Sequence, residues 1–307
     1  MSRFQEAMQP WPALEPYARS IYLPRNGLML HLYEAGATDA PPIFLIHGLA
    51  DEADTWRHLV PPLSAQYRII APDLPGFGRS EKPDLPYTVP FFRDILLELL
   101  DTLEVQRAVL VGHSLGAVIT HALALDHRER VDRLVLIGGS LVTRSQRVDL
   151  ATMLFLIPGL GEWLYTRLRR DPQAAYRTLE PYYGNLDHLP EADREFLFQR
   201  VNERVWSDGQ RRAFLSAFRN LARWIPGQQR GLPSRLAALD VPTLVLWGEA
   251  DRMVPVENGH ALVELQPTAR LVVVPGAGHN VHQERPEAVV KALQAGSYES
   301  MPDQAQP

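Results

Sequence analysis

The stretch that decides the fold is VLVGHSLGAV, residues Val109–Val118. A β-branched apolar run precedes Gly112 and an apolar run of helical pattern follows, so we expect a strand that turns sharply into a helix at Ser114. Gly112 and Gly116 carry no side chain to obstruct such a turn. Ser114 would then lie at a helix N-terminus, where unpaired N–H groups favour developing negative charge. A serine that merely caps the helix is the alternative interpretation.

Short apolar runs rich in β-branched residues recur along the chain, with helical patterns between several of them. The strand-like runs are Leu28–Tyr33, Ile43–Ile46, Tyr67–Ala71, Ala108–Val111, Leu134–Ile137, Thr243–Trp247 and Leu271–Val274. The clearest helical patterns are Phe91–Leu103, Leu115–Asp126 and Pro286–Leu293. Continuously apolar strands are typical of a parallel sheet that helices cover on both faces. The sequence therefore predicts an α/β fold with a mostly parallel sheet.

One interval interrupts this alternation. Residues 141–230 contain helical patterns and scattered aromatic residues but no strand-like run. Because so long a segment cannot be a structureless loop in a compact domain, we expect a helical cap inserted between two strands. The predicted core domain is then 1–140 together with 231–307. Core helices that alternate with the sheet are the alternative.

A serine hydroxyl needs a neighbouring base to become a good nucleophile. His279 follows a strand-like run on the glycine-bearing loop of VVVPGAGHNVHQERPE, from which its ring can reach the edge of the sheet. Asp251, at the end of LVLWGEAD, is positioned to orient that imidazole, and Glu249 is the second choice. His279 and His282 are spaced like a metal-binding pair, but no convincing third ligand accompanies them, so we predict no metal.

The strand-like run Ile43–Ile46 is followed by His47 and Gly48. Because Gly48 has no side chain, the backbone there can approach a ligand closely. The N–H groups of Leu49 and Leu115 are therefore the predicted oxyanion hole. We expect the turn after Ile46 and the turn at Ser114 to be stabilised by four neighbouring residues: Gly48, Gly112, His113 and Gly116.

Three carboxylates, those of Asp51, Glu52 and Asp54, follow the predicted oxyanion donor. We expect this stretch to be a solvated loop. If it instead faces the site, its charge would disfavour anionic substrates.

Composition excludes several classes of function. The 307 residues carry a formal net charge of -5 and no cysteine, so neither a basic nucleic-acid surface nor a thiolate site is expected. The apolar stretch Met153–Leu164 is too short to span a membrane and is interrupted by proline and glycine, so we expect it to be buried or to line a pocket. With no secretory signal visible, we expect a cytoplasmic protein.

These pieces together resemble the α/β-hydrolase fold family, in particular its cap-bearing esterases, lipases and carbon-carbon bond hydrolases. The matching segments are LIHG, APDLPGFGRS, GHSLG, LVLWGEADRMVP and GAGHNVHQERPE, in the order Ser, Asp, His that this family uses. The resemblance implies an eight-stranded sheet with an inserted helical cap, a serine nucleophile and no cofactor. Dehalogenases and epoxide hydrolases of the family carry an aspartate where this chain has Ser114.

The expected activity is hydrolysis of short to medium, mostly uncharged carboxylic esters through an acyl-enzyme on Ser114. Candidate residues for the substrate pocket are Met153, Leu154, Phe155, Trp163 and Trp206. A carbon-carbon bond hydrolase with the same triad, of the type that acts on meta-cleavage products, is the alternative. A ligand receptor without turnover is the third hypothesis.

Overall fold

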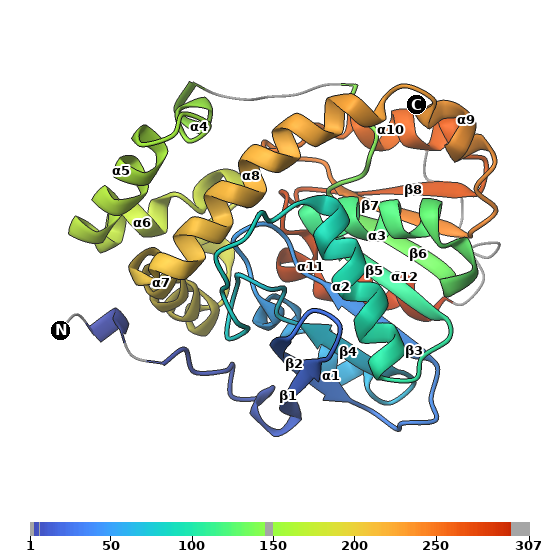
Figure 1. Cartoon of the computed structure of the whole chain (residues 1–307), viewed down its shortest axis with the longest axis horizontal. Coiled ribbons are helices and arrows are strands. Elements are labelled where there is room, and N and C mark those ends of the chain that lie inside the picture. The colour runs from blue at the N-terminus through green and yellow to red at the C-terminus, as the bar shows by residue number, and fades with distance from the viewer. Residues whose placement is uncertain (1–2, 6, 145–149, 296–307) are drawn as a thin grey trace.

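The computed structural model describes residues 3–5, 7–144 and 150–295 and contains one eight-stranded sheet (Figure 1). Its strands lie in the order β1-β2-β4-β3-β5-β6-β7-β8. They are β1 (Ala18–Leu23), β2 (Leu28–Ala35), β3 (Pro42–Ile46), β4 (Arg68–Pro72), β5 (Ala108–His113), β6 (Val131–Ile137), β7 (Thr243–Gly248) and β8 (Ala269–Val274). The strands from β4 to β8 pair in parallel, whereas β2 is antiparallel to both β1 and β4. The predicted mostly parallel α/β sheet is confirmed.

Both faces of the central strands are buried, which explains their continuously apolar sequences. In β5, Leu110 belongs to one apolar cluster, while Val109 and Val111 belong to the cluster on the opposite face. The first face is covered by α2 (Val89–Thr102), α3 (Leu115–Asp126), α9 (Leu232–Ala237) and α10 (Glu257–Leu265). The second face is covered by α1 (Val60–Leu63), α11 (Val281–Glu284) and α12 (Pro286–Gln294).

Short 3-10 helices complete the connections. They are η1 (Arg3–Gln5), η2 (Glu15–Tyr17), η3 (Ala53–Trp56), η4 (Arg128–Arg130), η5 (Leu168–Arg170), η6 (Glu180–Tyr182) and η7 (Leu186–His188).

Between β6 and β7 the described residues form helices and no strand. We call the segment from α4 to α8 the helical insertion; it comprises α4 (Leu150–Leu154), α5 (Leu160–Arg167), α6 (Pro172–Arg177), α7 (Glu191–Trp206) and α8 (Asp208–Gln228) together with η5–η7. In Figure 1 most of it lies to the left of the sheet, and α8 runs diagonally back toward it. Because β6 and β7 are neighbours in the sheet, the chain leaves the core and returns to it at adjacent strands.

Several elements were not predicted from the sequence, among them β1 and α10. The edge strand β1 alternates exposed and buried residues only near its end, so it lacks the continuous apolar run that marks the inner strands. The nine-residue α10 lies between β7 and β8, and its helical pattern is short. Within the described part of the chain, no helix is both long enough and apolar enough to cross a membrane.

Candidate active site

Ser114 lies where β5 ends and α3 begins, in a strained backbone conformation. Its φ is 53° and its ψ is -114°, a combination that a non-glycine residue rarely adopts. A Cβ on Gly116 would lie 2.1 Å from the carbonyl oxygen of Ile46, and a Cβ on Gly112 would lie 2.4 Å from that of Gly116. Both glycines are therefore required by close packing. The Ser114 side chain makes no capping hydrogen bond with α3, which argues against the helix-cap interpretation.

His279 and Asp251 form a buried pair above the ends of the strands. The Nδ1–H of His279 donates to Oδ2 of Asp251 at 2.8 Å, and both residues are at most 5% exposed. The other carboxylate oxygen accepts the N–H groups of Met253 and Val254 at 2.8 and 2.9 Å. These two bonds fix the carboxylate, so it can hold the imidazole with Nε2 free to accept a proton. Glu249 is exposed and accepts the N–H of Gly276 instead.

Two glycines at the end of β6 separate the serine from the histidine. A Cβ on Gly139 would lie 2.6 Å from the carbonyl oxygen of Ser114, and a Cβ on Gly138 would lie 3.1 Å from Nδ1 of His279. Ser114 and His279 thus pack against consecutive residues of one short segment. The three predicted catalytic residues therefore meet at one edge of the sheet, beyond the carboxyl ends of β5, β7 and β8.

The predicted oxyanion donors lie on the elements that the sequence indicated. Leu49 belongs to a tight turn in which the N–H of Asp51 donates to the carbonyl oxygen of Gly48 at 3.4 Å. Ala50 has a φ of 58° within this turn. A Cβ on Gly48 would lie 3.2 Å from the Cβ of Ser114, so the turn rests directly on the serine. Leu115 is the first residue of α3, where backbone N–H groups have no acceptor within the helix.

Three imidazoles around these loops are held neutral. Burial lowers the pKa of His113 to about 3, with the neighbouring His279 as a further cause, and burial likewise lowers the pKa values of His47 and His282. His113 donates from Nε2 to the carbonyl oxygen of His279 at 3.2 Å, which anchors the histidine loop. His47 bonds the backbone through both ring nitrogens, at Gly48 and Leu74.

The expectation of a solvated acidic loop is wrong. Glu52 and Asp54 are 1% and 0% exposed, and the side chain of Asp51 is 15% exposed. Arginines neutralise them: Arg204 lies 2.7 Å from both Asp51 and Glu52, Arg200 lies 3.1 Å from Glu52, and Arg79 lies 2.7 Å from Asp54.

Burial alone would raise the pKa of the Asp51 carboxyl. The Arg204 guanidinium more than offsets this effect, with His47, His113 and the Thr55 hydroxyl also contributing, so the pKa falls below its usual value. The Asp51 side chain is therefore an ionised carboxylate at neutral pH.

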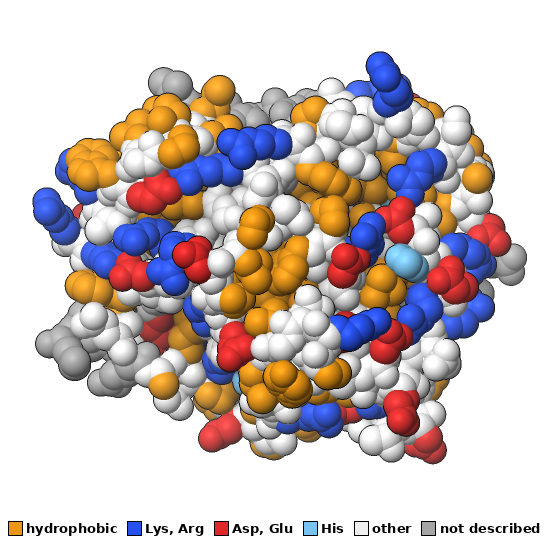
Figure 2. Space-filling view, in the orientation of Figure 1, with side chains coloured by type: hydrophobic (Ala, Val, Ile, Leu, Met, Phe, Trp, Pro, Cys, Tyr) orange, Lys and Arg blue, Asp and Glu red, His pale blue; other side chains and the backbone are white. Residues whose placement is uncertain are grey.

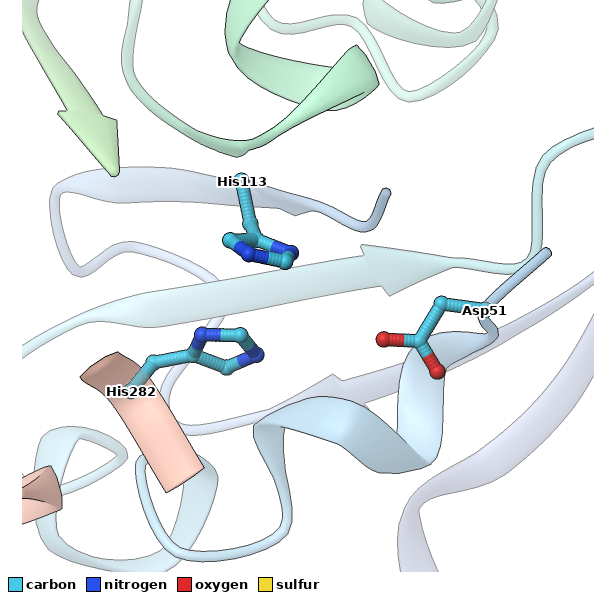
Figure 3. Close-up of side chains that lie close together, drawn as sticks. All are labelled: Asp51, His113 and His282. Atoms are coloured by element: carbon cyan, nitrogen blue, oxygen red, sulfur yellow. The ribbon is translucent and has the colours of Figure 1, made fainter. Parts of the chain in front are cut away.

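Asp51, His113 and His282 form a cluster that has the composition of a metal site. One potential ligand atom of each lies within 4.8 Å of the others. Figure 3 shows the Asp51 carboxylate directed toward the two imidazole rings, which lie one above the other. However, Asp51 already pairs with Arg204, and Nε2 of His282 lies 2.6 Å from the hydroxyl of Thr55. A cation bound there would lie near the positive charge of Arg204, so we assign no metal to this cluster.

The candidate pocket residues separate into two groups. Met153 and Trp163 are 49% and 53% exposed, which does not suit side chains that line a pocket, and we do not assign them to it. The helix α5, which carries Trp163, packs on the rest of the insertion through Tyr165 instead. Leu154, Phe155 and Trp206 are half-buried, with the Phe155 ring 6.1 Å from that of Phe214.

The arginine partners of the acidic turn were missed by sequence reasoning. Arg200 and Arg204 lie on α7, about 150 positions from Glu52 in the chain. The only signal was the acidic run itself, since buried carboxylates require counter-charges. On the face shown in Figure 2, basic and acidic side chains are interspersed.

Comparison with known proteins agrees with this architecture. The pattern of the alpha/beta hydrolase fold family matches residues 41–286. The chain is similar to 2-hydroxymuconate semialdehyde hydrolase of a Pseudomonas species, with 30% identity over 82% of this chain and 84% of that protein. It is also similar to epoxide hydrolase A of Mycobacterium tuberculosis, with 30% identity over 87% of this chain and 94% of that protein.

Among solved structures, a meta-cleavage product hydrolase named CumD matches with a TM-score of 0.74. The identity is 26%, and the match covers 90% of this chain and 96% of that one. The family pattern, the relatives and the sheet topology agree with one another. This chain therefore belongs to the α/β-hydrolase fold family, a fold that it shares with hydrolases.

Proposed function

We propose that the protein hydrolyses uncharged carboxylic esters through an acyl-enzyme on Ser114. His279 takes the hydroxyl proton as Ser114 attacks the ester carbonyl, and then gives it to the leaving alcohol. Asp251 orients the imidazole and stabilises its protonated form. The N–H groups of Leu49 and Leu115 hold the oxyanion. Water activated by His279 then releases the acid and regenerates the serine.

The observation that carries this proposal is the buried His279–Asp251 hydrogen bond beside a strained serine. Strain at a turn residue persists only where the surrounding structure enforces it, and it concentrates at functional sites. The absence of a capping bond from Ser114 leaves its hydroxyl available for chemistry.

The charges around the oxyanion turn favour an uncharged substrate. Several relatives act on carboxylates, as the names dienoate and dienedioate hydrolase state. In this chain Arg204 and Arg200 already bind Asp51 and Glu52, so neither cation is left to receive a substrate carboxylate. This balance of charges supports ester hydrolysis over cleavage of an anionic dienoate.

The carbon-carbon bond hydrolase stays the second candidate because relatives with that activity match nearly the whole chain. Hydrolysis of epoxides is less well supported, since epoxide hydrolases of this fold use an aspartate in place of Ser114.

The helical insertion is proposed to act as the cap, with predicted bounds of 141–230. Contacts with the histidine loop support this role: the N–H of Asn280 donates to the carbonyl oxygen of Tyr182 at 3.0 Å, and the Tyr182 ring lies 5.9 Å from the ring of His279. The insertion also contacts the oxyanion turn, through the bond between Arg204 and Asp51.

The first test compares the wild type with Ser114→Ala in stopped-flow release of p-nitrophenol from acetate, butyrate and octanoate esters. We expect a burst or steady turnover in the wild type and a loss of about 10³-fold or more in the variant. The trend with acyl length would measure the pocket.

Absence of turnover on all three esters would contradict the ester proposal. Loss of the ultraviolet absorbance of a dienoate substrate would then identify a carbon-carbon bond hydrolase. If neither substrate class reacts but ligands bind, the receptor hypothesis is favoured.

A further inference from the structure

The turn that carries Leu49 contains a strained residue. Ala50 adopts the left-handed region with a φ of 58°, which is unfavourable for a side chain with a Cβ. The only backbone hydrogen bond across this turn is long, at 3.4 Å from the N–H of Asp51 to the oxygen of Gly48. Such a conformation must be held by neighbouring groups. The direction of the Leu49 N–H therefore depends on what anchors the residues after Ala50.

Both residues that follow Ala50 are bound by one guanidinium. Nη2 of Arg204 donates to Asp51 at 2.7 Å, and Nε donates to Glu52 at 2.8 Å. The Arg204 side chain is 9% exposed, and its planar fork fixes two carboxylates at once. Arg204 comes from α7 of the helical insertion, so an element outside the core domain holds the turn.

The same turn is connected to the histidine loop. The hydroxyl of Thr55 bonds Asp51 and accepts the side-chain amide of Gln283 at 2.7 Å. Its oxygen also lies 2.6 Å from Nε2 of His282. His282 and Gln283 belong to α11, which begins two residues after His279. The network thus joins the insertion, the oxyanion turn and the segment that carries the histidine.

Of the three carboxylates in this network, Asp51 depends most on Arg204. Glu52 also pairs with Arg200, and Asp54 pairs with Arg79 and Arg200. Among the ion pairs of the described residues, Asp51 has Arg204 alone. Loss of Arg204 would therefore release the residue nearest to Ala50 while leaving the other carboxylates with a partner.

We propose that Arg204 is a positioning residue that acts through Asp51 to aim the Leu49 N–H at the oxyanion. This inference rests on the proposed function, in which that N–H stabilises the tetrahedral intermediate. The helical insertion then does more than cover the site, because its α7 determines the geometry of the transition-state contact. Substrate binding needs no contact with Arg204 in this arrangement.

The test compares an ester with its thionoester, whose sulfur accepts hydrogen bonds poorly and so gains little from an oxyanion hole. We expect Arg204→Met to lower kcat/KM for the ester by about tenfold to hundredfold, mostly through kcat. The ester-to-thionoester ratio should fall by a similar factor, whereas Arg204→Lys should restore part of it. Asp51→Asn should reproduce the effect, and the double variant should add little.

The matched control is Arg219→Met, which removes another arginine of the insertion whose partner is Glu162 rather than the oxyanion turn. Its ester-to-thionoester ratio should equal that of the wild type. If Arg204→Met lowers the melting temperature but leaves this ratio unchanged, Arg204 contributes only to stability and the inference is wrong.

A second readout separates this inference from the proposed function. Hydrogen–deuterium exchange of the backbone amides of residues 49–55 should speed up in Arg204→Met and in Asp51→Asn, but not in Arg219→Met. If the wild type hydrolyses no ester, the function fails while this coupling is still measured. Unchanged exchange in both Arg204→Met and Asp51→Asn would overturn the inference, whatever their activity. If Arg204→Met does not fold, Asp51→Asn and Arg204→Lys take its place in the test.

Discussion

At the scale of single residues, the choice between two neighbouring carboxylates depends on what each one binds. Asp251 accepts two backbone N–H groups with one oxygen and the His279 imidazole with the other. Glu249 is exposed and bonds the turn at Gly276. Only Asp251 is both fixed and directed toward the imidazole, so the orienting role falls to it.

Asp251→Asn should lower kcat by about 10³- to 10⁴-fold, because an amide stabilises the wrong tautomer of His279. The fold should be retained, since Asn keeps an oxygen for the backbone N–H groups. Circular dichroism and ester hydrolysis would check both points. Glu249→Gln is the matched control, and a larger loss in that variant would transfer the role to Glu249.

At the scale of elements, the junction of β5 and α3 depends on close backbone packing. A Cβ on Gly116 would lie 2.1 Å from the oxygen of Ile46 on β3. Gly116→Ala should therefore lower the free energy of unfolding by about 1–3 kcal/mol or more, and the strand–helix turn would shift with it. Denaturant unfolding and ester turnover would both report the change.

The control is Gly227→Ala, because a Cβ on Gly227 in α8 meets nothing within 4 Å. Alanine at that helical position should be neutral or stabilising by up to about 1 kcal/mol. Equal stability of the two variants would contradict the packing argument.

The sequence predicts elements well where local patterns determine them. The inner strands were found because burial on both faces makes them continuously apolar, and the turn at Ser114 was found because its glycines stand at fixed positions. The edge strand β1 was missed because most of its residues face solvent. The acidic turn was misjudged because the arginines that neutralise it come from α7, and no local pattern connects these segments.

At the scale of the whole molecule, buried imidazoles make stability depend on pH. Burial lowers the pKa of His121 to about 4 and that of His113 to about 3, with His47 and His282 shifted in the same direction. Because the unfolded chain binds protons near the usual histidine pKa of about 6.5, acid favours the unfolded state. This stability is present in full above about pH 6.5 and is lost as the pH falls toward the folded-state values.

His121→Gln should make the protein less sensitive to acid. With a folded-state pKa of about 4, one buried histidine accounts for about 2 kcal/mol of the stability lost between about pH 7 and pH 5. The change in the free energy of unfolding between these pH values should therefore shrink by about that amount in the variant. Urea titrations at the two pH values measure it, and an unchanged difference would show that His121 titrates normally in the folded protein.

Because β6 and β7 are adjacent, the helical insertion could in principle be exchanged between relatives at two junctions, one after β6 and one before β7. The ion pairs between α7 and the turn after β3 limit this exchange. A core grafted onto a foreign insertion would keep Glu52 and Asp54 buried without Arg200, and Asp51 without Arg204. A chimera with a foreign insertion should therefore also change Asp51 and Glu52, whereas Asp54 keeps its pair with Arg79.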